Sequence, residues 1–150
     1  MRVLIQRVKK ASVSIEGNLV SSIEQGILLL VGIECADQDD DILWLSNKIS
    51  GLRIFDDENG VMNLSLKDIG GDILAVSQFT LHARVKKGFR PSYIEAAPPD
   101  ISIPIYNKFV SQLESDLGKK VYTGEFGAEM QVELINDGPV TIFIDSKNKK

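Results

Sequence analysis

Three hydrogen-bonding side chains stand where an apolar segment in the middle of the chain comes to an end. Ser77, Gln78 and Thr80 belong to the stretch Ser77–Leu81, at the end of a strand expected over residues 72–78. Sites often form where a rigid strand meets a variable loop. A hydroxyl in such a place could act as a nucleophile or orient a substrate. The alternative is that Ser and Thr only satisfy backbone groups at the strand end.

A second unusual segment, Asn136–Thr141, contains the dipeptide Gly138-Pro139 and lies between two strands expected over 128–136 and 139–145. Asp-Gly and Gly-Pro both favour turns, so the residues alone predict a tight hairpin turn. X–Pro bonds are also the bonds that can be cis in folded proteins. A special backbone geometry at Pro139 therefore remains open.

Other familiar catalytic arrangements are missing from the sequence. His82 is the only histidine and Cys35 the only cysteine, which argues against a zinc site. No nucleophile elbow, phosphate-binding loop or dinucleotide fingerprint occurs. The acidic run Asp37–Asp41 lacks calcium-loop spacing and is interpreted as a helix start. We expect neither a metal nor a cofactor, and we interpret His82 as incidental to catalysis.

Length and composition indicate one domain over residues 1–150. The chain is 43% hydrophobic and 25% charged, as in ordinary globular proteins. Its longest apolar run, Ile27–Ile33, is too short to cross a bilayer. With no signal-peptide pattern at the start and one cysteine, the expected location is the cytoplasm. The net charge of −4 argues against broad binding of nucleic-acid phosphates, although not against a grip on the last few nucleotides of an RNA.

The elements that must position these residues form an α+β pattern, a layered ββα sandwich with two main helices. The first helix is expected over Asp37–Gly51. The second is expected to be capped by Ser102, with Pro104 in its first turn and Gly118 at its end. The first four strands suggest a mainly antiparallel arrangement with a turn at Gly17-Asn18, and the sheets as a whole are expected to be largely antiparallel or mixed. Strands are expected at 2–8, 11–16, 19–23, 26–34, 52–55, 72–78, 119–124, 128–136 and 139–145. Residues 82–99 are expected to form an irregular loop and 146–150 a frayed tail.

Taken together, the two unusual segments resemble a known family. Ser77–Leu81 resembles the signature of the D-aminoacyl-tRNA deacylases, long called D-tyrosyl-tRNA deacylases. Asn136–Thr141 resembles the second signature of that family, the Gly-cis-Pro motif, and the order and separation of the two match. Met1–Val8, Gly88–Ser92 and Gly124–Met130 extend the resemblance over the chain to about Asp145. A related family carries Pro and Ala where this chain has Ser77 and Phe79, which favours the D-specific branch.

The resemblance implies hydrolysis of the ester between a D-amino acid and the terminal ribose of tRNA. Ser77, Gln78, Phe79 and Thr80 would form the catalytic segment, with backbone amides near Phe79 and Thr80 stabilising the oxyanion. Thr80 could be the nucleophile, but the sequence offers it no evident base. We favour attack by water assisted by the ribose 2′-hydroxyl, with Thr80 as a positioning group.

The resemblance also implies a homodimer in which each copy presents its Gly-Pro motif to the partner's active site. The carbonyls of Gly138 and Pro139 would exclude an L side chain while admitting D-amino acids and glycine. Asn136 and Asp137 belong to the same motif, and Arg7 would hold it in place. The expected walls of the substrate pocket are Phe89, Phe126 and Met130.

Three further alternatives remain at this stage. The basic residues Arg84, Lys86, Lys87 and Arg90 could contact acceptor-end phosphates or form a solvated loop. A general esterase using Thr80 or Ser77 would cleave simple esters without chiral preference. A non-catalytic RNA-binding module would bind tRNA without turnover, although the acidic composition counts against it.

Overall fold

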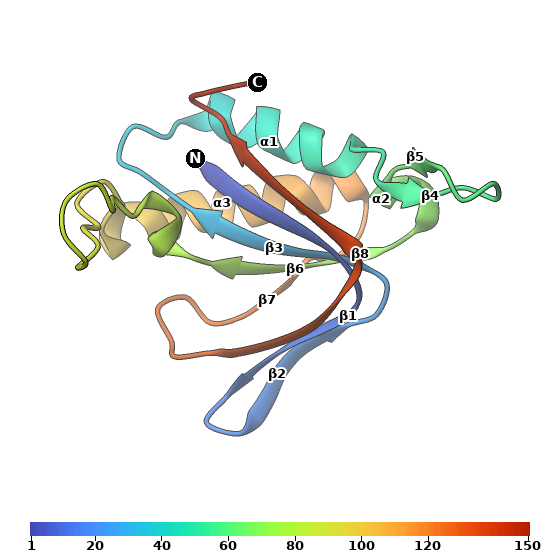
Figure 1. Ribbon diagram of the computed structural model, residues 1–150, viewed down its shortest axis with the longest axis horizontal. Helices are drawn as coiled ribbons and strands as arrows, with labels where there is room; N and C mark the ends of the chain where they lie inside the picture. Colours follow the sequence, from blue (N-terminus) through green and yellow to red (C-terminus); the bar gives the residue numbers. More distant parts are fainter.

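Strand β1 (Arg2–Ile15) runs through the centre of the main sheet in the computed structural model, which describes residues 1–150 (Figure 1). Its first half pairs with β3 (Gly26–Gly32) and its second half with β2 (Asn18–Ile23), both antiparallel. Two strands were expected here, but the chain makes one. Register shifts opposite β8 (Gln131–Asp145) around Val8 interrupt the regular pairing without ending the strand.

The β1–β2 hairpin is confirmed, and its turn lies one residue earlier than expected. Glu16 and Gly17 both have positive φ angles, 50° and 79°. Two consecutive left-handed residues are what a two-residue hairpin turn requires.

The sheet is mixed, which confirms the expected fold class. Its strands are ordered β2-β1-β3-β6-β7, and β8 pairs with the free side of β1. Strand β6 (Asp72–Ser77) runs parallel to β3, and β7 (Tyr122–Thr123) runs parallel to β6. Helical crossovers connect these parallel neighbours, as parallel pairing requires. Of the strand expected at 119–124, only Tyr122 and Thr123 form β7.

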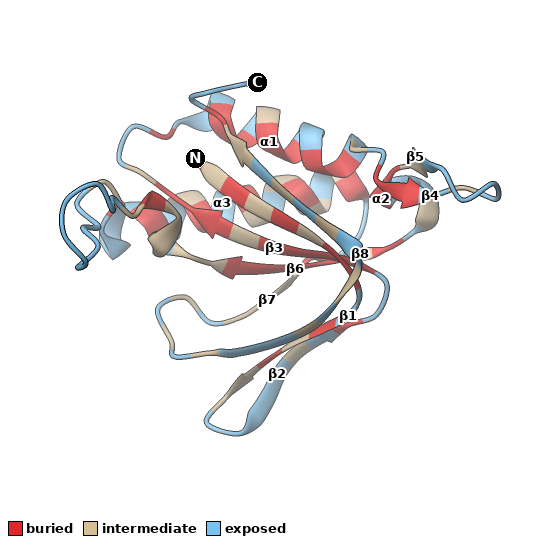
Figure 2. Ribbon diagram, viewed as in Figure 1, coloured by how far each residue is buried: buried red, intermediate tan, exposed pale blue.

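Two helices cover one face of this sheet. Helix α1 (Asp39–Gly51) begins after Gln38, which forms a capping box with Asp41. Helix α3 (Pro99–Leu117) lies beside it, and the Ser46 hydroxyl on α1 donates to Asp116 on α3 at 2.6 Å. Figure 2 shows that the buried residues of both helices face the sheet. This layer contains the larger core, which includes Val3, Ile5, Ile27, Leu45, Ile49, Ile73, Phe109 and Leu113.

The start of α3 differs from the expectation. Pro98 precedes the helix and Pro99 is its first residue, a position where the missing proline amide costs nothing. Ser102 is therefore inside the helix, where its hydroxyl donates to the Pro98 carbonyl at 3.1 Å instead of capping. Pro104 is also inside the helix. The end at Gly118, with φ of 70°, is as expected.

Four short elements complete the connections. Strands β4 (Phe55–Asp56) and β5 (Met62–Leu64) form a separate two-stranded sheet, so the strand expected over 52–55 begins only at its last residue. Helix α2 (Leu66–Ile69) precedes β6, and the 3₁₀ helix η1 (Phe79–His82) follows it. Residues 83–98 then form the irregular loop that the prolines and glycine predict.

The last strand corrects the hairpin predicted at Gly138-Pro139. Strand β8 (Gln131–Asp145) is continuous, and both of its halves pair with β1. Val8 pairs with Asn136 and Gln6 pairs with Thr141, so the four residues 137–140 stand opposite Arg7 alone. The segment is a bulge on an edge strand, because β1 pairs with β8 on both sides of it and the strand therefore continues.

The tail expected to fray from residue 146 is held at its beginning. Ser146 is buried, and its hydroxyl accepts from the Met1 ammonium and donates to Asp41 at 2.6 Å. The Lys147 ammonium lies 2.7 Å from the same carboxylate. Further along, the Lys149 ammonium lies 4.6 Å from the centroid of the Trp44 ring, so contacts continue to residue 149.

Candidate functional site

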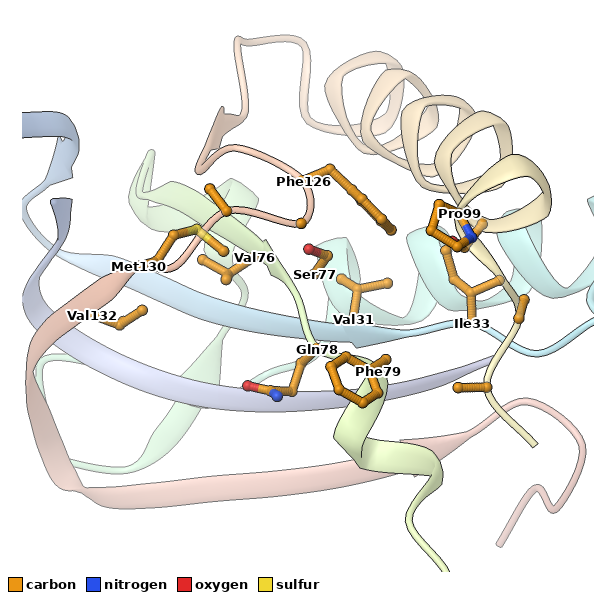
Figure 3. Close-up of a pocket in the computed structure, with 15 residues that line it drawn as sticks. Val31, Ile33, Val76, Ser77, Gln78, Phe79, Pro99, Phe126, Met130 and Val132 are labelled. Carbon is orange, nitrogen blue, oxygen red and sulfur yellow. The ribbon is translucent and has the colours of Figure 1, made fainter. Parts of the chain in front are cut away.

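A cavity of about 520 Å³ opens at the carboxyl ends of β3 and β6. Figure 3 shows Met130 towards one end of it, Ile33 and Pro99 towards the other, and Ser77 between them. The lining is mostly apolar, which suits an organic ligand with a few polar anchoring points. It consists of Val31, Ile33, Val76, Ser77, Gln78, Phe79, Ala96, Ala97, Pro99, Ser102, Phe126, Gly127, Ala128, Met130 and Val132.

The paired ends of β3 and β6 place the first predicted segment at this cavity. Ser77 is in register with Val31, and the Gln78 amide donates to the Val31 carbonyl at 2.7 Å. The chain then turns into η1, which lies close against the end of β3. A Cβ on Gly32 would lie 2.9 Å from the Cβ of Leu81 and 3.1 Å from the Gln78 carbonyl oxygen. Gly32 thus permits a close approach that the sequence reading did not identify.

Thr80 lies beside the cavity with an amide partner. Its hydroxyl oxygen accepts a short hydrogen bond from the side-chain amide of Gln78. His82 is buried, and neither of its ring nitrogens has a hydrogen-bond partner. No basic side chain therefore contacts the Thr80 hydroxyl to remove its proton.

The start of η1 supplies backbone donors at the same place. In a 3₁₀ helix each amide bonds to the carbonyl three residues earlier. The amides of Phe79 and Thr80 begin the helix, so neither has an intrahelical acceptor. Such amides can stabilise negative charge on an oxygen at the cavity edge.

Phe126 and Met130, two of the three residues expected to wall the substrate pocket, line this cavity. Phe126 meets the ring of Tyr106 edge-on, with centroids 5.6 Å apart, and the Tyr106 hydroxyl donates to the Ala75 carbonyl at 3.0 Å. Burial raises the pKa of Tyr106 to about 12, so this phenol stays neutral and serves as a support. Met130 packs over Gly124, where a Cβ would lie 2.5 Å from the methionine sulfur.

The structure does not bring Phe89 to the cavity. Its side chain is fully exposed, at 107%, on the loop after η1, and it is absent from the lining. Phe89 does not form a wall of this cavity within one chain. Conversely, sequence reading missed Ile33, Pro99 and Ser102, whose side chains meet only because β3 and the start of α3 converge. The Ala-Pro-Pro run at 97–99 was the one local signal of a fixed helix entry.

The second predicted segment is braced by Arg7. The Arg7 guanidinium, whose side chain is 7% exposed, donates to the Asp137 carbonyl at 2.8 Å and to the Ile54 carbonyl at 2.6 Å. A Cβ on Gly138, where φ is 138°, would lie 3.0 Å from a terminal nitrogen of that guanidinium. Arg7 thus contacts the bulge directly, and the Gly138–Pro139 peptide bond is cis.

Asn136 closes the neck of the bulge. Its side-chain oxygen accepts from the Val140 amide at 2.8 Å, and its side-chain nitrogen donates to the Thr141 hydroxyl at 2.9 Å. These bonds replace ladder bonds that the extra residues interrupt. Gly138 and Pro139 project from the neck and are exposed.

The bulge and the cavity do not meet within one chain. Arg7, beside the bulge, pairs with Ile27, whereas Ser77, at the cavity, pairs with Val31 four residues further along β3. That offset is about 13 Å along the strand, with two strand spacings of about 4.8 Å between β3 and β8 in addition. The two predicted motifs are therefore well separated on the monomer.

Two features of other protein classes were sought in the fold. No three His, Cys, Asp or Glu side chains gather as potential metal ligands. None of the helices has the length and apolar character needed to span a bilayer.

Comparison with known proteins identifies the family. The sequence model described as "D-Tyr-tRNA(Tyr) deacylase" matches residues 4–145. D-aminoacyl-tRNA deacylases from Flavobacterium psychrophilum and Bacteroides fragilis are 65% and 63% identical over 150 residues, which cover 100% of this chain and of each relative.

Two solved structures share the fold. One is titled "c-Myc DNA Unwinding Element Binding Protein", with a TM-score of 0.90, 40% identity and coverage of 97% of this chain and 98% of the other. The second, a probable eukaryotic D-amino acid tRNA deacylase, has a TM-score of 0.82 at 17% identity, with 95% and 97% covered, and supports the fold alone.

The fold is that of the D-aminoacyl-tRNA deacylases, which are hydrolases. Within that class, the chain belongs to the D-Tyr-tRNA(Tyr) deacylase family.

Proposed function

We propose that this protein hydrolyses the ester that links D-amino acids, and glycine mischarged on tRNA, to the 3′-terminal ribose of tRNA. The observation that carries the proposal is the pair of amides at the start of η1, beside an apolar cavity. Ester hydrolysis passes through a tetrahedral intermediate, and unpaired amides are suited to stabilise its oxyanion. The apolar walls, Phe126 and Met130 among them, suit varied side chains or the adenine ring.

The attacking group in this proposal is water, assisted by the 2′-hydroxyl of the terminal ribose. Water adds to the ester carbonyl, the bond to the ribose oxygen breaks, and that oxygen leaves with a proton. Thr80 is a positioning group, because its hydroxyl is held by Gln78 and has no base beside it. His82 takes no part, since both of its nitrogens are buried away from any partner.

Rejection of L-aminoacyl-tRNA is assigned to Gly138 and Pro139 of a second copy of the chain. The two residues are exposed and too far from their own cavity to act there. A homodimer that brings each bulge to the partner's cavity would place their carbonyls against the substrate α-carbon. Strand β8 is an edge strand with apolar side chains exposed, which is consistent with an interface; they are Val132, Ile135 and Phe143.

Selection by exclusion predicts which substrates are accepted. A carbonyl pair that blocks only the L side-chain position leaves space for a hydrogen, so glycine enters as readily as a D-amino acid. Chiral proofreading during translation follows, and the cytoplasm is the proposed location. The single thiol, Cys35, is exposed and unpaired, which fits a reducing compartment.

The test is deacylation of matched D-tyrosyl-, L-tyrosyl- and glycyl-tRNA by the purified protein. We expect rapid loss of the D and glycyl esters while the L ester persists. Cleavage of both enantiomers would leave a hydrolase but refute the exclusion model. A terminal 2′-deoxyadenosine should slow D-tyrosyl cleavage greatly; full activity on it, with loss in Thr80→Ala, would instead support a threonine nucleophile.

A further inference from the structure

The segment between the catalytic turn and helix α3 carries a concentration of positive charge. We call residues 84–94 the basic loop. It contains four basic residues, Arg84, Lys86, Lys87 and Arg90, and no acidic residue, in a chain whose net charge is −4. Figure 2 shows it as an almost wholly exposed projection beyond η1.

The base of this loop is fixed beside the cavity. Arg84 and Ser92 exchange backbone hydrogen bonds of 2.8 and 3.0 Å, and the Arg84 guanidinium pairs with Glu95. The ring of Tyr93 meets the ring of Phe79 edge-on, with centroids 5.0 Å apart, and Phe79 lines the cavity. The loop therefore starts from the wall of the cavity.

The tip of the loop is unpartnered. Lys86, Lys87 and Arg90 make no ion pair and no side-chain hydrogen bond within the chain, unlike Arg84. Phe89 stands among them with its ring fully exposed, and Gly88, at φ of 67°, makes the turn that presents it. Phe89 is three residues from Ser92, so it lies at most about 11 Å along the chain from the fixed base.

This combination fits single-stranded nucleic acid. Three free cations suit successive phosphates, and an exposed aromatic ring offers a face on which an unpaired base can stack. Base faces within a duplex are already stacked, so a duplex would use the cations and leave Phe89 without a partner. If the loop only faced solvent, there would be no reason for Lys86, Lys87 and Arg90 to lack acidic neighbours.

We propose that the basic loop binds the single-stranded nucleotides that precede the terminal adenosine of tRNA. Their phosphates contact Lys86, Lys87 and Arg90, and one base stacks on Phe89. This rests on the proposed function, which puts the acylated adenosine in the adjacent cavity. Contacts confined to the basic loop would allow a protein of net charge −4 to bind RNA.

Three D-tyrosyl esters separate the loop from the cavity: those of adenosine, of the terminal trinucleotide of tRNA, and of the whole tRNA. The variants are Phe89→Ala, Phe89→Trp and the double change Lys86→Gln/Lys87→Gln. Lys67→Gln/Lys150→Gln is the matched control, because it removes the same charge from two exposed lysines outside the loop that make no ion pair.

Phe89→Ala should raise KM for the trinucleotide and tRNA esters by about 5- to 150-fold. Phe89→Trp should keep KM near the wild-type value, because stacking needs an aromatic ring. The double lysine variant should weaken the dependence of log KM on log salt by about 1.4, at about 0.7 for each single-strand phosphate contact. Cleavage of the adenosine ester should be unchanged in every variant, and the control should match wild type on all three.

Binding of the unacylated, fluorescently labelled trinucleotide gives a readout independent of cleavage. Loop-dependent binding without cleavage of any ester would refute the proposed function alone. Unchanged KM and binding in Phe89→Ala would refute the loop proposal alone. The exposed loop would then be a candidate site for a protein partner. An effect seen only with whole tRNA would indicate duplex contacts, and an equal loss on the adenosine ester would indicate support of the cavity; either result overturns the proposal.

Discussion

Replacing Gly32 by alanine tests how closely η1 must lie against the end of β3. The new Cβ would lie 2.9 Å from the Cβ of Leu81, 3.1 Å from the Gln78 carbonyl oxygen and 3.1 Å from Cδ2 of His82. Leu81 belongs to η1, and the Gln78 carbonyl is backbone immediately before it. The turn itself must therefore move by several tenths of an ångström. Overpacking of this kind costs about 1–3 kcal/mol of folding free energy.

The same displacement acts on catalysis, because the amides of Phe79 and Thr80 move with the turn. A shift approaching 1 Å in a positioned group can cost about 100-fold in rate. We expect Gly32→Ala to remain folded at 25 °C and to lose between about 10- and 100-fold in kcat for D-tyrosyl-tRNA. Urea denaturation measures the first effect and single-turnover deacylation the second.

Two other glycines provide matched controls. A Cβ on Gly51, in helix α1, meets nothing within 4 Å, so Gly51→Ala should stabilise the protein by about 0.5–1 kcal/mol and leave kcat unchanged. A Cβ on Gly71 would lie 2.7 Å from a Leu66 methyl group, far from the cavity, so Gly71→Ala should lower stability without lowering kcat. If Gly32→Ala kept wild-type stability and kcat, or if Gly71→Ala lost kcat equally, the account of a turn positioned by Gly32 would be refuted.

Two further outcomes follow from the contacts at the bulge and the tail. Asn136→Ala removes the acceptor for the Val140 amide, so the bulge loosens. Cleavage of L-tyrosyl-tRNA should then rise while cleavage of D-tyrosyl-tRNA persists. An unchanged preference for the D ester over the L ester would contradict the assigned role. Burial would raise the pKa of Asp41, but hydrogen bonds from Lys147, Ser146 and Gln38 outweigh it and lower the pKa from 3.8 to about 2. This stabilisation is complete above pH 3.8 and is lost as the pH falls towards 2; denaturant titrations should show a shallower acid dependence in Asp41→Asn.

Local patterns were sufficient for several elements. The alternation that buries Val3 and Ile5 predicted a strand, because a strand turns successive side chains to opposite faces. The acidic first turn located α1 to within two residues, and Gly118 located the end of α3. In each case the deciding interaction lies within a few residues along the chain.

The errors arose where distant segments compete with local preference. Asp-Gly and Gly-Pro favour a turn, yet residues 137–140 form a bulge because β1 pairs on both sides of them. Ser102 is a good capping residue, yet Pro98 and Pro99 start the helix earlier.

The sequence by itself determined the family, and it singled out Ser77–Leu81 and Asn136–Thr141 as the segments that carry the resemblance, because these depend on residue types in a fixed order. Only the tertiary structure decided that Ile33, Phe79, Pro99 and Phe126 share one cavity, since no local rule relates residues so far apart. It also decided that Arg7 binds the Asp137 carbonyl across 130 positions and that the bulge stands apart from its own cavity. The physical reason is that a cavity is the space left between packed elements, and packing is a property of the whole chain.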